Sequence, residues 1–157
     1  MPTRAEVSES AEYDGHTDLM RAALEGQTET MEGLLKTGAD VNASDNEGRT
    51  ALMFAAVNMH TDSVKALLEH GADVNATAND GGTALMLAAS SGEMEVVRAL
   101  LSKGADVSGR FTQTGKTALM LAREKDYSDI AQLLQAAETQ QARKARNSKA
   151  NDTNQSH

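Results

Sequence analysis

The pattern of apolar and polar positions in this chain repeats about every 33 residues. Four similar strings, TDLMRAA, TALMFAA, TALMLAA and TALMLAR, begin at threonines that are 33, 33 and 34 residues apart. The string GADV recurs twice at a spacing of 33, and a leucine stands 17 residues after each threonine. Three markers in one register identify an internal repeat. The marker positions are Thr17, Thr50, Thr83 and Thr117; Gly38, Gly71 and Gly104; and Leu34, Leu67, Leu100 and Leu134.

Each repeat predicts two short helices joined by a turn. Thr50 is a good N-cap residue, and the string ALMFAA that follows it is rich in strong helix formers. A second helix is expected from Thr61, where a hydroxyl cap is followed by an acidic residue in the first turn. Val64 and Leu67 stand at helical spacing and predict an apolar stripe on that helix. Gly71 then stands where a helix end favours a positive φ.

The repeat predicts a stacked architecture. One pair of such short helices cannot bury its apolar face, but about three or more stacked copies can. Small residues in each first helix allow neighbouring repeats to approach closely. The expected fold class is therefore all-α, a solenoid of helix-turn-helix units. The small pairs are Ala22-Ala23, Ala55-Ala56 and Ala88-Ala89.

The pattern G-x-T-A-L-M-x-A-A, followed by L-L-x-x-G-A-D-V-N, resembles the ankyrin repeat, and residues 15–138 carry it. The resemblance implies a unit of two antiparallel helices with a short β-hairpin finger, stacked into a curved solenoid. It also implies a function, because members of this family are usually adaptors, inhibitors or scaffolds that bind a protein on their concave face. We therefore expect a non-catalytic protein–protein interaction module without a cofactor or a metal.

The same register divides the chain into three parts. Residues 1–14 are predicted to be a polar, disordered leader without the apolar segment of a secretory signal. Residues 139–157 are predicted to be a basic, polar, disordered tail, since they hold little to bury, although residues 140–146 could extend the last helix. Between them we expect an ankyrin-repeat domain over residues 15–138. Its repeats are expected at about residues 15–47, 48–80, 81–114 and 115–138.

The first and last repeats are expected to cap the solenoid. Arg21 and Arg123 replace apolar residues of the inner repeats, and the fourth repeat lacks both GAD and a following finger. Polar caps predict a monomer. The methionines at the fourth position of each string (Met20, Met53, Met86 and Met120) are expected to form core between repeats rather than a metal site or a flexible groove.

Composition and charge exclude several functions. The 157 residues include no cysteine, which excludes disulfides, thiolate zinc sites and a cysteine nucleophile and fits a reducing compartment such as the cytoplasm. No stretch approaches the length of a membrane span. The chain has 15 basic and 23 acidic residues, but residues 139–157 hold four of the bases and one of the acids. Residues 1–138 therefore carry a net charge of −11, which favours neutral or basic partners and disfavours nucleic acid.

Catalytic and metal-binding motifs are largely missing from the sequence. The four histidines do not pair at i, i+4, so no helical zinc motif is formed. The string GRFTQTGKT, from Gly109 to Thr117, resembles a phosphate-binding loop with one residue too many, and the repeat register already explains it. Nucleotide binding or an enzymatic role of this loop remains the first alternative. Weak, salt-sensitive nucleic-acid binding by the basic tail is the second.

Two departures from the repeat have structural consequences. Met59 stands where Gly26 and Gly92 stand in their repeats. If that position keeps a positive φ, Met59 is strained by about 1 kcal/mol, unless Asn58 takes the left-handed turn in its place. The third finger carries one extra residue.

The finger asparagines have two interpretations. Asn42 and Asn75 are expected to hydrogen-bond within their finger turns. The family resemblance implies a second role for them, as substrates of an asparaginyl hydroxylase.

The residues expected to contact a partner are the variable, outward positions of the fingers and of the ends of the first helices. Phe111 is the leading anchor, because it is an aromatic residue in a polar finger and aromatic residues dominate binding hot spots. Leu24 and Glu25 belong to the same surface. The remaining predicted contacts are Ser44, Asn46, Glu47, Arg49, Val57, Asn58, Asn79, Asp80, Ser90, Ser91, Arg110, Lys116, Glu124 and Lys125.

Overall fold

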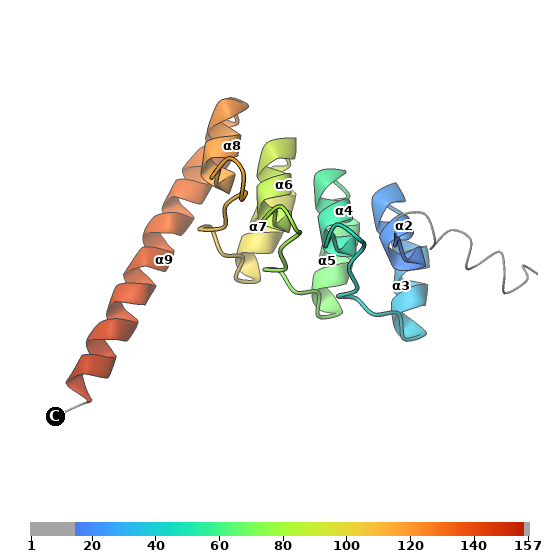
Figure 1. The fold of residues 1–157 in the computed structure, drawn as a ribbon, viewed down its shortest axis with the longest axis horizontal. Helices are drawn as coiled ribbons and strands as arrows, with labels where there is room; N and C mark the ends of the chain where they lie inside the picture. Colours follow the sequence, from blue (N-terminus) through green and yellow to red (C-terminus); the bar gives the residue numbers. More distant parts are fainter. Residues whose placement is uncertain (1–14, 156–157) are drawn as a thin grey trace, which may run out of the picture.

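The computed structural model describes residues 15–155, and these form a row of paired helices (Figure 1). The predicted leader, residues 1–14, lies outside the described residues. The first helices of the pairs, α2, α4, α6 and α8, pack in sequence against one another, and the second helices, α3, α5, α7 and α9, form a second layer. The all-α solenoid of helix-turn-helix units is confirmed. The bounds are α2 Asp18–Glu25, α3 Thr28–Lys36, α4 Ala51–Val57, α5 Thr61–Glu69, α6 Ala84–Ser91, α7 Met94–Ser102, α8 Ala118–Glu124 and α9 Ser128–Asn154.

A threonine begins every first helix, as the sequence predicted. In all four, the Oγ1 atom accepts a hydrogen bond from the backbone N–H three residues later, at 3.2 to 3.5 Å. Such bonds satisfy one of the N–H groups that a helix start leaves without a partner. The four capping residues are Thr17, Thr50, Thr83 and Thr117.

Helix α5 starts one residue earlier than the predicted hydroxyl cap at Thr61 implies, and α3 starts in the same way at Thr28. Thr28 and Thr61 are the first helical residues, and the caps before them, Gln27 and His60, make no side-chain capping bond. The predicted hydroxyl cap at Thr61 is therefore wrong by one position. Thr28 instead uses its hydroxyl between repeats, where its Oγ1 atom lies 2.9 Å from Oγ of Ser63.

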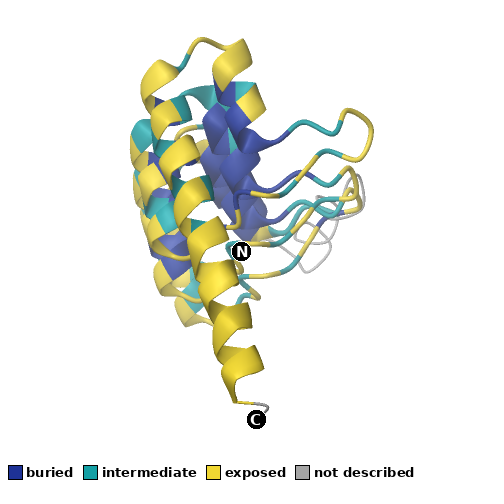
Figure 2. Cartoon of the chain, turned by 90° about the vertical axis from the view of Figure 1, so that its left-hand side faces the viewer, coloured by how far each residue is buried: buried dark blue, intermediate teal, exposed yellow. Residues whose placement is uncertain are grey.

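The core lies between the two helix layers (Figure 2). The paired alanines of α2, α4 and α6 are at most 3% exposed, so the small residues do form the close contacts between repeats. Met20, Met53 and Met86 are buried, as expected of an inter-repeat core. Met120 is 43% exposed, which corrects the prediction for the last repeat. The physical reason is its position at the end of the stack, where no fifth first helix covers it.

The fingers are hydrogen-bonded turns without regular strands over the described residues 15–155. The first finger has an isolated antiparallel bridge between Ser44 and Thr50. The predicted hairpins are thus too short to form a β-ladder. They project together to one side of the helix layers (Figure 2).

Helix α9 replaces most of the predicted disordered tail. It has 27 residues, and beyond residue 141 every described position is exposed as the helix extends past the rest of the solenoid (Figure 1). The extension over residues 140–146 that the sequence allowed is present, and the prediction of disorder differs from the structure over residues 147–154. Alanine, glutamine, lysine and arginine in this segment are good helix formers, and Gln141 attaches its start to the third repeat.

The turns after the four first helices share a left-handed backbone conformation. Gly26 and Gly92 have φ values of 71° and 83°, and Met59 and Asp126 have 61° and 60°. Asn58 has a φ of −95°, so it does not take the turn in place of Met59. The predicted positive φ of Met59 is confirmed. Asp126 is a second non-glycine residue with a positive φ at this turn, and it was not predicted from the positions of Gly26 and Gly92.

Candidate functional site

The fingers form a continuous row because backbone groups bond from one finger to the next. The N–H of Asn79 donates to the carbonyl of Glu47 at 2.9 Å, and the N–H of Thr112 donates to the carbonyl of Asp80 at 2.8 Å. The side chain of Asn79 adds a bond from its Nδ2 atom to the carbonyl of Asn46 at 3.1 Å. These contacts fix the spacing of the fingers and present a preorganised surface.

Glycine is required where the second and third fingers meet. Gly81 has a φ of 84°, and a Cβ atom on it would lie 2.5 Å from the carbonyl oxygen of Arg110. Gly82, the next residue, would bring a Cβ within 2.9 Å of the ring atom Cε1 of Phe111. The phenyl ring therefore lies against the backbone of the neighbouring finger. Gly82 was not predicted as a site residue, although its glycine pair with Gly81 distinguishes the second finger.

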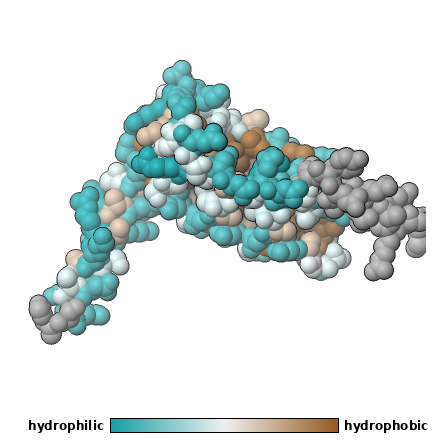
Figure 3. All heavy atoms as spheres, viewed as in Figure 1, coloured by the Kyte–Doolittle hydropathy of each residue, from teal (hydrophilic) through white to brown (hydrophobic). Residues whose placement is uncertain are grey.

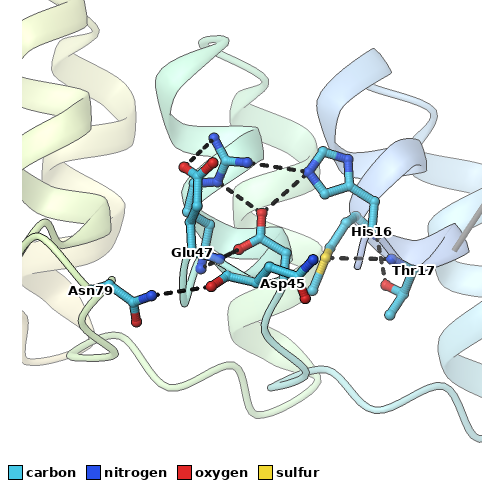
Figure 4. A network of polar contacts seen from close by, with 8 residues as sticks. His16, Thr17, Asp45, Glu47 and Asn79 are labelled. Carbon is cyan, nitrogen blue, oxygen red and sulfur yellow. Dashed lines mark hydrogen bonds and ion pairs between the residues drawn. The ribbon is translucent and has the colours of Figure 1, made fainter. Parts of the chain in front are cut away.

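The first finger is held by a buried carboxylate (Figure 4). Asp45 accepts hydrogen bonds from the backbone N–H groups of Glu47 and Arg49 at 3.0 and 2.8 Å, and its Oδ2 atom pairs with Nε of Arg49 at 2.8 Å. Nε2 of His16 lies 3.2 Å from the same oxygen. The Arg49 guanidinium also lies 5.0 Å from the ring centre of Phe54, so it is fixed by charge and by an aromatic face.

The environment of Asp45 lowers the pKa of its carboxyl group. Burial raises the pKa of this carboxyl. The hydrogen bonds from the backbone and side chain of Arg49, the positive charge of Arg49 and the N–H of Glu47 lower the pKa by more than burial raises it, so it lies below its ordinary value of 3.8. The carboxylate is therefore the stable form at neutral pH. It serves the structure of the finger, since its side chain is fully covered.

A pocket of about 180 Å³ is lined by residues of all three fingers and of the first helices behind them. Met53, Leu87 and Phe111 supply its apolar side chains. The structure brings five predicted contact residues together here, whereas the sequence analysis missed Met53, Leu87, Ala78 and Gly82. The register of the first helices could have indicated Leu87, which is half-buried, but it placed Met53 in the core, and Ala78 and Gly82 belong to the second finger. The lining residues are Glu47, Arg49, Met53, Ala78, Asn79, Asp80, Gly82, Leu87 and Phe111.

The predicted contacts at the ends of the first helices do not line this pocket. Val57 is exposed, and its carbonyl accepts a bond from Oγ of Ser91 at 3.0 Å. Asn58 donates to the carbonyl of Phe54 within its own helix at 2.8 Å. The other residues of this group, and the remaining finger positions, do not line the pocket either, and they are exposed or half-buried. They are Leu24, Glu25, Ser44, Asn46, Ser90, Arg110, Lys116, Glu124 and Lys125.

The loop from Gly109 to Thr117 is the third finger. The N–H of Phe111 donates to the carbonyl of Lys116 at 3.1 Å, and the ammonium of Lys116 pairs with the carboxylate of Glu124 at 2.8 Å. A phosphate-binding loop instead leaves its lysine and its backbone N–H groups facing the phosphates. The geometry is therefore that of a finger.

Residues 15–155 contain no cluster of three potential metal ligands. Among these residues, too, no helix has the length and apolar character needed to cross a membrane.

The finger asparagines bond between repeats, which corrects the expectation of bonds within one turn. Asn42 accepts from the N–H of Asp73 at 2.7 Å and donates to the carbonyl of Gly71 at 3.3 Å. Asn75 makes the same pair of bonds: it accepts from the N–H of Asp106 and donates to the carbonyl of Gly104. Both side chains therefore join one repeat to the next.

The comparisons with known proteins agree with this geometry. A family model described as three copies of the ankyrin repeat matches residues 3–78 and again residues 74–145. A search of curated proteins returned no match. The family matches cover most of the chain, and they include the finger row and both helix layers. The chain therefore belongs to the ankyrin-repeat family.

Proposed function

We propose that this chain is a non-catalytic module that binds a protein partner through its finger row and the adjacent ends of its first helices. Ankyrin repeats are generally protein–protein interaction modules. The observation that carries the proposal is the pocket beside Phe111, where five predicted contact residues from three fingers meet. The cysteine-free composition supports a cytoplasmic location, and the polar caps support a monomer that acts as an adaptor or scaffold.

Preorganisation supports binding at this surface. The finger-to-finger hydrogen bonds fix the backbone before any partner arrives, so less conformational entropy is lost on binding. The surface seen in Figure 3 is largely hydrophilic, with small hydrophobic areas. Phe111 is half-buried and adjoins a hollow, which is the setting in which an aromatic side chain contributes most to an interface.

The test is affinity capture from the native host with three forms of the full chain. Wild type and Met120→Ala should retain the same partner, because Met120 is an exposed apolar residue that does not line the pocket. Phe111→Ala should lose it, since removal of an anchor residue costs about 2 kcal/mol or more of binding free energy. Equal capture by all three forms would contradict the proposed surface.

The nucleotide alternative is tested on the same protein. If the loop from Gly109 to Thr117 bound ATP or GTP, millimolar nucleotide with magnesium would raise the melting temperature. We expect no shift, because Lys116 is paired with Glu124 and the loop is closed as a finger. A shift that Lys116→Ala abolishes would favour nucleotide binding.

A second candidate role belongs to the projecting part of α9. Arg143, Arg146 and Lys149 follow one another at intervals of three, so they lie along one side of an exposed helix. A contact of this kind with a nucleic-acid backbone would be weak and sensitive to salt. DNA binding at low salt, measured with the full chain and with a chain lacking residues 143–157, decides whether this role exists.

A further inference from the structure

We infer that the pocket lined by the three fingers takes one large apolar side chain of the partner, flanked by a lysine or an arginine. This inference rests on the proposed function and specifies the chemistry of the ligand. Three observations support it: the size of the pocket, its apolar lining and the distribution of charge on its rim.

The size of the pocket suits a single side chain. Its volume is about 180 Å³, and an apolar cavity of about 150 Å³ is enough to hold benzene. A leucine, methionine or phenylalanine side chain fits this space, whereas an entire helix does not. Leu87 and Phe111, which are half-buried, supply apolar surface that such a side chain would cover, and Met53, which is 2% exposed, adds little to it.

The rim of the pocket is acidic. Glu47 and Asp80 are exposed, and both line the pocket. The only basic lining residue among those described is Arg49, and its guanidinium already pairs with Asp45 at 2.8 Å and with Glu47 at 3.2 Å. Asp80 accepts a bond from the N–H of Gly82 at 2.9 Å, and within residues 15–155 it has no ion pair. A cationic group of the partner would therefore meet uncompensated negative charge.

The basic residues of the third finger do not neutralise this rim. Lys116 pairs with Glu124 at 2.8 Å. Arg110 donates to the carbonyl of Gly115 at 3.1 Å and lines a different hollow, which faces α9. The net charge of −11 over residues 1–138 adds to the attraction of a cationic segment. An acidic segment would be repelled at the same place.

The experiment selects ligands from a random peptide library on the immobilised full chain. The enriched sequences should contain a leucine, isoleucine, methionine or aromatic residue next to a lysine or an arginine. The best peptide is then synthesised and titrated against the wild type and single variants. Each variant is first compared with the wild type by circular dichroism, so that only folded proteins are tested.

The variants separate the two parts of the inference. Phe111→Ala should weaken peptide binding about tenfold or more. Asp80→Asn keeps an oxygen for the N–H of Gly82, and should weaken binding about two- to fivefold at low salt and less at about 500 mM salt. Glu95→Gln removes an exposed acid on α7, away from the pocket, and should have no effect. Glu47→Gln should act in the same direction as Asp80→Asn.

Two results would overturn the inference while leaving the proposed function in place. One is enrichment of acidic peptides, or of peptides without a basic residue, whose binding Phe111→Ala abolishes. The other is the absence of any enriched peptide while Phe111 remains necessary for capture of a protein partner. Peptides whose binding none of the pocket variants alters would contradict both the inference and the proposed surface.

Discussion

The side-chain amide of Gln141, on α9, donates a hydrogen bond of 2.8 Å to the backbone carbonyl of Ala105, in the loop that ends the third repeat. Its Oε1 atom accepts a second bond from the N–H of Val107 at 3.2 Å. Asn42 and Asn75 make comparable paired bonds between earlier repeats. The fourth repeat has no such loop, and Gln141 supplies the terminal contact in its place.

We expect Gln141→Ala to lower the free energy of unfolding by about 1–2 kcal/mol, because two backbone groups lose their partner. Hydrogen exchange should also become faster in α9 beyond residue 141, where every described position of the helix is exposed. Gln140→Ala is the matched control, since Gln140 is exposed. If urea unfolding gave equal midpoints for the two variants, the anchoring role of Gln141 would be wrong.

The lowered pKa of Asp45 makes stability depend on pH in a defined direction. A carboxyl group with a lower pKa in the folded state stabilises that state above its unfolded pKa, near 3.8, and this contribution disappears as the pH falls through the folded value. At pH 7, Asp45→Asn should therefore be less stable than the wild type by about 1–3 kcal/mol.

The difference between Asp45→Asn and the wild type should shrink as the pH is lowered from about 5, and it should be smallest below the folded pKa of Asp45. Urea unfolding at a series of pH values measures it. Glu29→Gln, which changes an exposed acid of α3, should stay within about 0.5 kcal/mol of the wild type throughout. A gap between Asp45→Asn and the wild type that is constant with pH would show that the charge of Asp45 does not act as described.

The sequence predicts the fold well because every repeat carries the same local signals. The threonine before each first helix caps it, the paired alanines pack between repeats, and glycines such as Gly71, with a φ of 85°, end the second helices. Each signal acts within a few residues of its own position. A pattern that recurs at a fixed spacing then extends the local structure to the whole solenoid.

The candidate site is predicted only in part, because it depends on contacts between fingers about one repeat apart. Phe111 was expected at the surface, but its position against Gly82 follows from the third finger bonding to the second at Asp80. Asp45 gave no signal in the sequence, since its buried role requires Arg49 and His16 to converge on it. Helix α9 was missed beyond residue 146 because no apolar stripe marks it.

Leu100 tests the register of the inner stripe of α7. Its side chain is fully buried, whereas Leu101, the next residue, is half-buried. Leu100→Ala should therefore lower the free energy of unfolding by about 2–5 kcal/mol, through lost burial and the cavity that remains. Leu101→Ala should cost less, below about 2 kcal/mol. Urea unfolding that ranks the two variants in the opposite order would refute the register.

Met59 tests whether the left-handed turn after α4 stores strain. Its φ is 61°, and its side chain is 51% exposed, so replacing it by glycine removes the Cβ penalty and little packing. The greater freedom of glycine in the unfolded chain opposes this gain. Met59→Gly should stabilise the protein by up to about 1 kcal/mol.

The equivalent change Asp126→Gly should stabilise less, because aspartate tolerates a left-handed conformation better than methionine does. Asp126 has nearly the same φ, 60°, which makes it a matched comparison. The urea midpoint of each variant, at an unchanged m value, gives the change in free energy. A lower midpoint for Met59→Gly than for the wild type would mean that the methionine side chain contributes more by packing than its backbone costs in strain.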